Sequence, residues 1–167
     1  MKRRMIEDIN DELAYLNADV KDISSGGCGV FAITLYKELT KIGFKASLHL
    51  VCRNKAEKKD LIDYIKNNQS FTEETNIQSL MKKSWAHVMV KCEGRLIDSY
   101  GVYKSIRRSE VYGGYMITKE AIAPEIMEQC SGKDYAYLWN KMYDRRQNDV
   151  LIKGVEKLVE RLRKYIK

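Results

Sequence analysis

Residues 85–100 read WAHVMVKCEGRLIDSY, and this stretch gives the clearest indication of the fold. Polar and apolar residues alternate on both sides of Glu93-Gly94, a dipeptide suited to a tight turn. The pattern therefore predicts a β-hairpin. Because successive side chains of a strand point to opposite faces, one face is predicted to pack on the core. That face carries Val88, Val90 and Ile97.

The other face of the predicted hairpin brings together a histidine and a carboxylate. If Glu93-Gly94 is a two-residue turn, Met89 lies opposite Asp98 and His87 lies opposite Tyr100. His87 and Asp98 are then diagonal neighbours on one face. A four-residue loop keeps this arrangement, whereas a three-residue loop would separate the two side chains. The alternative is a histidine on a half-exposed sheet, with Asp98 simply solvated.

A glycine-rich segment, SSGGCG at residues 24–29, precedes a predicted helix whose apolar stripe ends before Gly43. Ser24 or Ser25 is expected to cap this helix. The first turn would then direct N–H groups and partial positive charge at the sulfur of Cys28, which favours a reactive thiolate. The backbone at Gly27, Cys28 and Gly29 is the candidate oxyanion site. The alternative is a turn that contains a cysteine by chance; a phosphate-binding loop would need a G-K-[ST] ending, which is absent.

The remaining elements complete an α+β chain with a small antiparallel sheet. Apolar spacing predicts an opening helix around residues 6–16, a strand at 45–52 and a short strand near 114–117. Helices are predicted within 55–83, with a loop around 67–76, and from 119 onward, with breaks near 131–132 and 148–149.

These residues suggest thiol chemistry. Cys28 is the candidate nucleophile, His87 the base and Asp98 the group that orients the histidine. His49 has no acidic neighbour at hairpin distance and is interpreted as structural. The other cysteines (Cys52, Cys92 and Cys130) are interpreted as small buried side chains. No C-x-x-C pair is present, so neither a metal site nor a disulfide framework is predicted, and no cofactor is assigned.

The Gly-Gly-Cys-Gly loop before a helix resembles the nucleophile segment of the papain-like superfamily, and residues 87–90 and 94–101 look like its histidine and acid strands. The order Cys, His, Asp also matches. The His-to-Asp stretch is most similar to the transglutaminase and arylamine acetyltransferase branches, and the chain is similar to small members from bacteria and their phages. The resemblance implies a papain-like core over about residues 20–105.

The glutamine that papain-type enzymes use in the oxyanion hole is absent from residues 17–27, so Asn17, Ser24, Ser25 or another backbone amide would donate. The acetyltransferase arginine is also absent, and acetyl-CoA is not assigned.

The function expected from these residues and this resemblance is hydrolysis of a peptide or isopeptide bond through a thioester. Transfer of the acyl group to an amine remains open, and the expected partner is a peptide or protein substrate. The alternative is a non-enzymatic papain-like scaffold that acts as a virion, partner-binding or nucleic-acid-associated protein.

The chain has 167 residues, with 30 Lys and Arg against 23 Asp and Glu, and a net charge of +7. A single domain is expected, with residues 118–167 as a helical extension. The last helix is predicted to pack on the core, because Glu156 and Glu160 interrupt its charge, although weak contact with an anionic or nucleic-acid surface is open. Its cations are Lys153, Lys157, Arg161, Arg163, Lys164 and Lys167.

No membrane-spanning run or secretory signal is recognised, so a cytoplasmic or virion location is expected.

Overall fold

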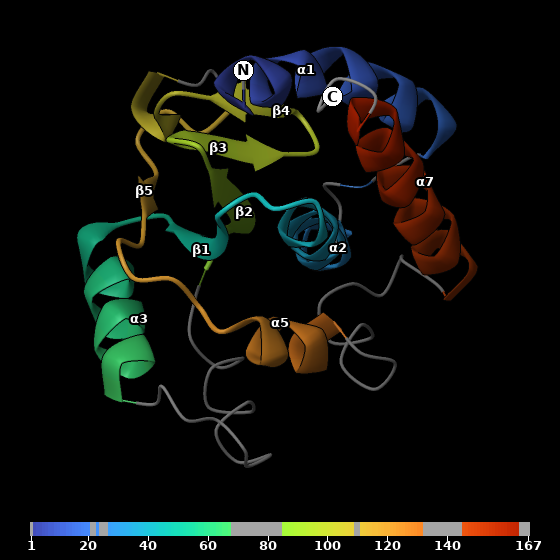
Figure 1. Cartoon of the computed structure of the whole chain (residues 1–167). Helices are drawn as coiled ribbons and strands as arrows, with labels where there is room; N and C mark the ends of the chain where they lie inside the picture. Colours follow the sequence, from blue (N-terminus) through green and yellow to red (C-terminus); the bar gives the residue numbers. More distant parts are fainter. Residues whose placement is uncertain are drawn as a thin grey trace.

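The computed structural model describes residues 2–20, 23, 27–67, 85–108, 111–131 and 145–163. Helices and strands alternate along the chain, as the sequence pattern predicts, and Figure 1 shows their arrangement. The helices are α1 (Lys2–Asp19), α2 (Cys28–Lys41), α3 (Lys55–Asn67), the 3₁₀ turn η2 (Ile106–Arg108), α5 (Pro124–Ser131) and α7 (Arg145–Arg163). The strands are β1 (Ala46–Cys52), β2 (His87–Cys92), β3 (Arg95–Asp98), β4 (Gly101–Tyr103) and β5 (Met116–Ile117).

The strands form one antiparallel sheet in the order β4-β3-β2-β1-β5, which confirms the α+β class. The predicted hairpin register is also confirmed, since Cys92 pairs with Arg95 and Val90 with Ile97. The turn between them has φ of 47° at Glu93 and 74° at Gly94. Two positive φ angles in a two-residue loop define the type I′ turn, whose twist matches that of the adjoining strands.

One face of the sheet packs on α2, which Figure 1 shows nearly end-on beside β1 and β2. The alternation of side chains explains which residues meet there. The strands contribute Leu48, Leu50, Cys52, Val88, Val90 and Ile97, and all six are fully buried. The apolar stripe predicted for α2 faces them with Phe31, Leu35 and Leu39. The sheet and α2 therefore build the main core of the described chain.

The last helix, α7, belongs to this same core and is not an appendage to it. Its apolar stripe is buried against α1 and α2, where Figure 1 shows it crossing the end of α1. A Cβ atom at Gly154 would collide with Leu16 of α1, so the glycine permits the close approach of these helices. The helix also continues through Asn148 and Asp149, where a break was predicted. Of its predicted cations, Lys164 and Lys167 lie outside the described residues.

Several predicted elements differ from those of the structure. Residues 119–123 are not helical, because Ile122 forms a bridge with Leu48 of β1 before α5 begins. β4 was not predicted, since three residues are too short to show a strand pattern. The helix predicted after residue 55 is α3, and the part of that prediction beyond Asn67 lies outside the described residues. Within the described ranges, none of the helices combines the length and the apolar character that a membrane span requires.

The type I′ turn gives a test of the hairpin. Glu93→Asn should raise the free energy of unfolding by about 0.5–1 kcal/mol, because asparagine adopts positive φ more readily than glutamate. Gly94→Ala should lower it by about 1–2 kcal/mol. No atom lies within 4 Å of a Cβ at Gly94, so the loss would come from the backbone alone. Urea denaturation measures both; equal stability of the two variants would contradict the turn assignment.

Candidate active site

Cys28 is the first residue of α2, at the end of the helix where N–H groups are free. The N-cap position is occupied by Gly27, whereas the sequence predicted a cap by Ser24 or Ser25. These two serines lie outside the described residues. The first bond across the helix start runs from the Phe31 N–H to the Gly27 carbonyl at 2.8 Å. The N–H groups of Cys28 and Gly29 precede this bond and remain candidates for an oxyanion site.

His87 and Asp98 meet as the hairpin register predicts. His87 Nε2 lies 3.0 Å from Asp98 Oδ2. His87 is 5% exposed and Asp98 is 0% exposed, so the alternative of a half-exposed histidine beside a solvated carboxylate is wrong. The sheet face that carries them is covered by a second apolar cluster. This cluster contains Val51, Met89, Leu96, Ile106 and Tyr112.

The buried carboxylate of Asp98 is satisfied by hydrogen bonds to both oxygens. Oδ1 accepts from the backbone N–H groups of Tyr100 at 2.8 Å and Gly101 at 3.1 Å. Oδ2 accepts from the hydroxyl of Tyr112 at 2.6 Å, in addition to its contact with His87. Because an unsatisfied buried carboxylate would be very costly, these donors hold Asp98 in place.

Tyr112 is the residue of this site that sequence reasoning missed. Its ring stacks on the imidazole of His87, with 5.2 Å between ring centroids and an interplanar angle of 24°. Tyr112 thus holds both members of the pair, one by stacking and the other by its hydroxyl. It lies in a turn without strand or helix periodicity, 14 residues beyond Asp98. No pattern in the sequence pointed to it.

The protonated form of His87 is favoured. Burial alone would lower the pKa of the ring, but hydrogen bonds and negative charge from Asp98 and Cys28 outweigh burial and raise it to about 9. The thiol of Cys28 is therefore close enough to interact with the imidazole. Since Nε2 contacts Asp98, Nδ1 is the nitrogen left for Cys28. The three predicted residues thus come together in the order Cys28, His87, Asp98.

Helix α1 anchors the turn that carries Asp98. The Asn10 side-chain oxygen accepts from the Val102 N–H at 2.8 Å, and Asn17 Nδ2 donates to the carbonyls of Ser99 and Leu13. Both N–H groups of the Asn17 amide are therefore engaged. Asn17 is not available as the second oxyanion donor, which corrects one of the options offered by the sequence.

The other histidine is held in a neutral form. His49 Nδ1 lies 3.0 Å from the Thr118 carbonyl, to which it donates, and Nε2 lies 2.9 Å from Ser47 Oγ. Burial is the main cause that lowers the pKa of His49. Cys52 and Cys92 are buried, while the side chain of Cys130 lies outside the described residues. In the described part of the chain, no group of three or more His, Cys, Asp or Glu side chains is placed to hold a metal ion.

The pKa values of the two histidines should lie on opposite sides of the ordinary histidine pKa of about 6.5. NMR of the imidazole protons should show the midpoint of His87 near 9 and that of His49 below 6.5. Cys28→Ser should lower the His87 midpoint, because a hydroxyl does not supply the thiolate charge, and should leave His49 unchanged as the internal control. A His87 midpoint at or below 6.5 would contradict the interaction with Asp98 and Cys28.

The raised pKa of His87 also makes the free energy of unfolding depend on pH. The folded state binds the His87 proton more tightly than the unfolded chain, so the contribution of His87 is fully present below pH 6.5 and is lost as the pH rises to about 9. The free energy of unfolding should therefore fall across this range in urea denaturation. A slope of the opposite sign would contradict the raised pKa.

Tyr112→Phe should keep the stacked ring but leave Asp98 with one donor fewer. We expect the free energy of unfolding to fall by about 1.5–3 kcal/mol, the usual value for a hydrogen bond to a charged group. Tyr115→Phe is the matched control, because within the described ranges the Tyr115 hydroxyl makes no hydrogen bond. Equal effects of the two substitutions would show that the Tyr112 hydroxyl does not stabilise Asp98.

Comparisons of the chain with models of protein families, with curated proteins and with solved structures give no match.

Proposed function

We propose that this protein is a cysteine hydrolase with a papain-like core that cleaves a peptide or isopeptide bond through a thioester. The observation that carries the proposal is the buried His87, which contacts Asp98 and whose pKa Asp98 and Cys28 together raise to about 9. A histidine with this pKa holds a proton at neutral pH, and the adjacent thiol can supply it. Attack would start from the form in which the thiol has passed its proton to the imidazole.

The arrangement of the elements supports the papain-like core. Cys28 begins a helix that packs on an antiparallel sheet, and the histidine and the carboxylate lie on the neighbouring strands β2 and β3. The helix start places free N–H groups and partial positive charge at the sulfur. This is the combination that thiol acyl transfer requires: a stabilised thiolate, a proton carrier and a group that orients the carrier.

In the first half of the reaction, the Cys28 sulfur attacks the carbonyl carbon of the substrate and a C–S bond forms. The negative charge that develops on the carbonyl oxygen would be stabilised by the Cys28 N–H at the start of α2. The C–N bond then breaks, and His87 Nδ1 gives its proton to the departing amine. A thioester on Cys28 and a neutral His87 remain.

In the second half, neutral His87 takes a proton from a water molecule, whose oxygen attacks the thioester carbon. The C–S bond breaks and releases the carboxylic acid, which leaves Cys28 as thiolate and His87 protonated again. If an amine attacks in place of water, the same steps transfer the acyl group. Throughout, Asp98 holds Nε2 and so keeps Nδ1 directed at the reacting atoms.

A small activated ester can test this chemistry without knowledge of the natural substrate. With p-nitrophenyl acetate, the protein should release p-nitrophenol over several turnovers, and intact-mass analysis should find one acetyl group on Cys28. Cys28→Ser should reduce the rate on the order of a thousandfold or more, because this site is not built to activate a hydroxyl. His87→Ala should reduce it strongly as well.

Cys52 provides the matched control. It is fully buried, and burial with the nearby Glu57 raises its pKa to about 11, so Cys52→Ser should leave the rate unchanged. Near pH 6, where only a stabilised thiolate reacts readily, iodoacetamide should modify Cys28 before Cys52 or Cys92. Equal modification of these cysteines, with no turnover of the ester, would replace the hydrolase by the non-enzymatic scaffold.

A further inference from the structure

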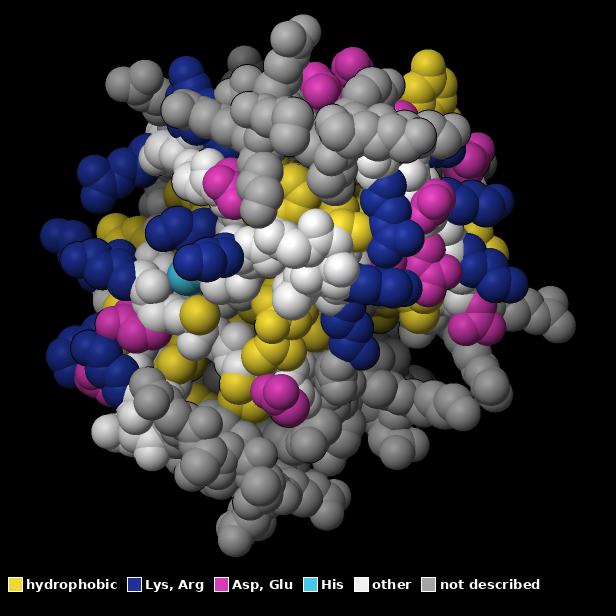
Figure 2. Space-filling model, viewed as in Figure 1, with side chains coloured by type: hydrophobic (Ala, Val, Ile, Leu, Met, Phe, Trp, Pro, Cys, Tyr) yellow, Lys and Arg dark blue, Asp and Glu magenta, His cyan; other side chains and the backbone are white. Residues whose placement is uncertain are grey.

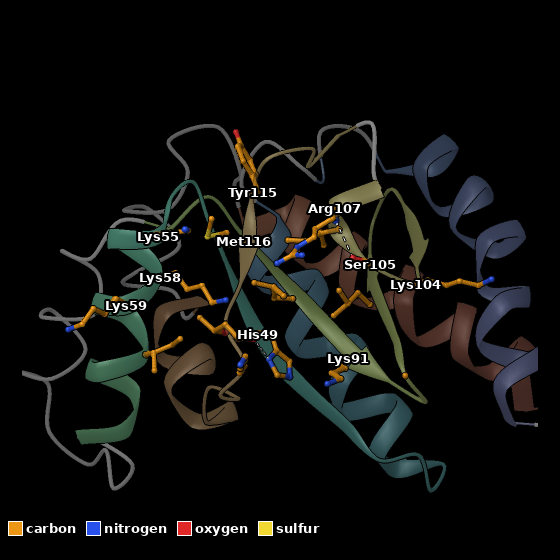
Figure 3. Close-up of a pocket in the computed structure, with 17 residues that line it drawn as sticks. His49, Lys55, Lys58, Lys59, Lys91, Lys104, Ser105, Arg107, Tyr115 and Met116 are labelled. Carbon is orange, nitrogen blue, oxygen red and sulfur yellow. Dashed lines mark hydrogen bonds between the residues drawn. The ribbon is translucent and has the colours of Figure 1, made fainter.

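A groove with a volume of about 830 Å³ opens on the sheet face opposite α2. Figure 3 shows it between α3 on one side and the segment around η2 on the other, with His49 and Lys91 at its base. Seven cationic side chains line it: Lys55, Lys58, Lys59, Lys91, Lys104, Arg107 and Lys119. Within the described residues, no aspartate or glutamate lines the groove. Like charges gathered in this way favour an anionic ligand.

The charges of the groove are available for such a ligand. Lys58 and Arg107 point toward each other across the groove from α3 and η2, whereas Lys59 points away and pairs with Asp63 at 2.8 Å. In the part of the chain that the structure describes, the other six cations form no ion pair. Figure 2 shows Lys and Arg side chains in two groups, one on the side of the molecule where Figure 1 places α3 and β5 and one on the side where it places α7.

The floor of the groove indicates what kind of anion fits. Leu96, Ile106 and Ile117 provide aliphatic surface between the cations, and Tyr115 is the one aromatic residue among the described lining. Single-stranded nucleic acid is held by rows of aromatic rings on which bases stack, and one tyrosine does not make such a row. Aliphatic surface with flanking ammonium groups suits a peptide that alternates carboxylates with apolar side chains.

The groove also lies on the sheet face that carries His87 and Asp98. His87, Met89 and Lys91 project from one face of β2, and His87 and Lys91 lie about 13 Å apart along an extended strand. Tyr115 lines the groove, and its ring centroid lies 6.1 Å from that of Tyr112, which stacks on His87. A chain that leaves the groove past Tyr115 would therefore run over the apolar cluster that covers His87 and Asp98.

We infer that this groove binds an acidic, partly apolar segment of the polypeptide substrate and thereby positions a neighbouring bond for Cys28. The assignment of the segment to a substrate rests on the proposed hydrolase function. The binding of an acidic peptide to the groove does not, because it depends only on the charges and the apolar floor.

The test measures binding by fluorescence anisotropy with a labelled peptide of alternating glutamate and leucine, and with an oligothymidylate of equal charge. Cys28→Ser protein is used throughout, so that no cleavage occurs. Lys58→Gln combined with Arg107→Gln should weaken peptide binding on the order of tenfold, since both charges point into the groove. Lys153→Gln combined with Lys157→Gln is the matched control; it removes the same charge from the exposed side of α7 and should change binding less than about twofold.

Equal weakening by the two double variants would overturn the inference, because it would indicate attraction by net charge alone. Stronger weakening by the α7 variant would overturn it in favour of the basic C-terminal helix. Tighter, groove-dependent binding of the oligothymidylate would overturn it in favour of nucleic acid. Failure of the hydrolase proposal is distinguishable: p-nitrophenyl acetate would then not be turned over, while groove-dependent peptide binding would persist. If only the groove assignment fails, the ester is still hydrolysed.

Discussion

The full burial of the Asp98 carboxylate is the constraint on which the site depends. A carboxylate without contact with water needs donors for its lone pairs, and here the donors come from three parts of the chain. The tight turn after β3 supplies two backbone N–H groups, β2 supplies His87, and the segment after η2 supplies Tyr112. Helix α1 then secures the turn through Asn10 and Asn17. The orientation of His87 toward Cys28 follows from these contacts, because a carboxylate fixed on one ring nitrogen directs the other.

The sequence predicted those parts of the site that lie on elements with a regular repeat of apolar and polar residues. A two-residue repeat and the Glu93-Gly94 turn were sufficient to pair β2 with β3 and to place His87 beside Asp98, since a strand has only two faces. The stripe of α2 and its end at Gly43 were equally regular, with Gly43 at φ of 86°. The start of α2 was less certain. Gly27 occupies the N-cap position, and the two serines predicted to cap the helix lie outside the described residues.

Contacts between distant segments could not be predicted in this way. Tyr112 lies in an aperiodic turn, and its role appears only when the chain returns to cover the face of β2. The cations of the groove are separated by up to 64 positions in the chain, from Lys55 to Lys119, and the pairing of β1 with both β2 and β5 brings them together. The packing of α7 against α1 could not be predicted either, because it depends on Gly154, which has no side chain and so allows the two helices to approach closely.

The groove lies on the sheet face that carries His87 and Asp98, yet the charges of the groove and of this pair act separately. Several unpaired cations near His87 would lower its pKa, whereas its pKa is raised, and its strongest influences besides burial are Asp98 and Cys28. Lys91 instead acts on His49, whose pKa it helps to lower. A distance of about 13 Å along β2 weakens the Coulomb interaction between Lys91 and His87, which is consistent with this independence. An acidic peptide in the groove would therefore neutralise charge there without removing the proton that His87 needs. Binding and proton transfer can thus be carried by one face of a small sheet without competing for the same charges.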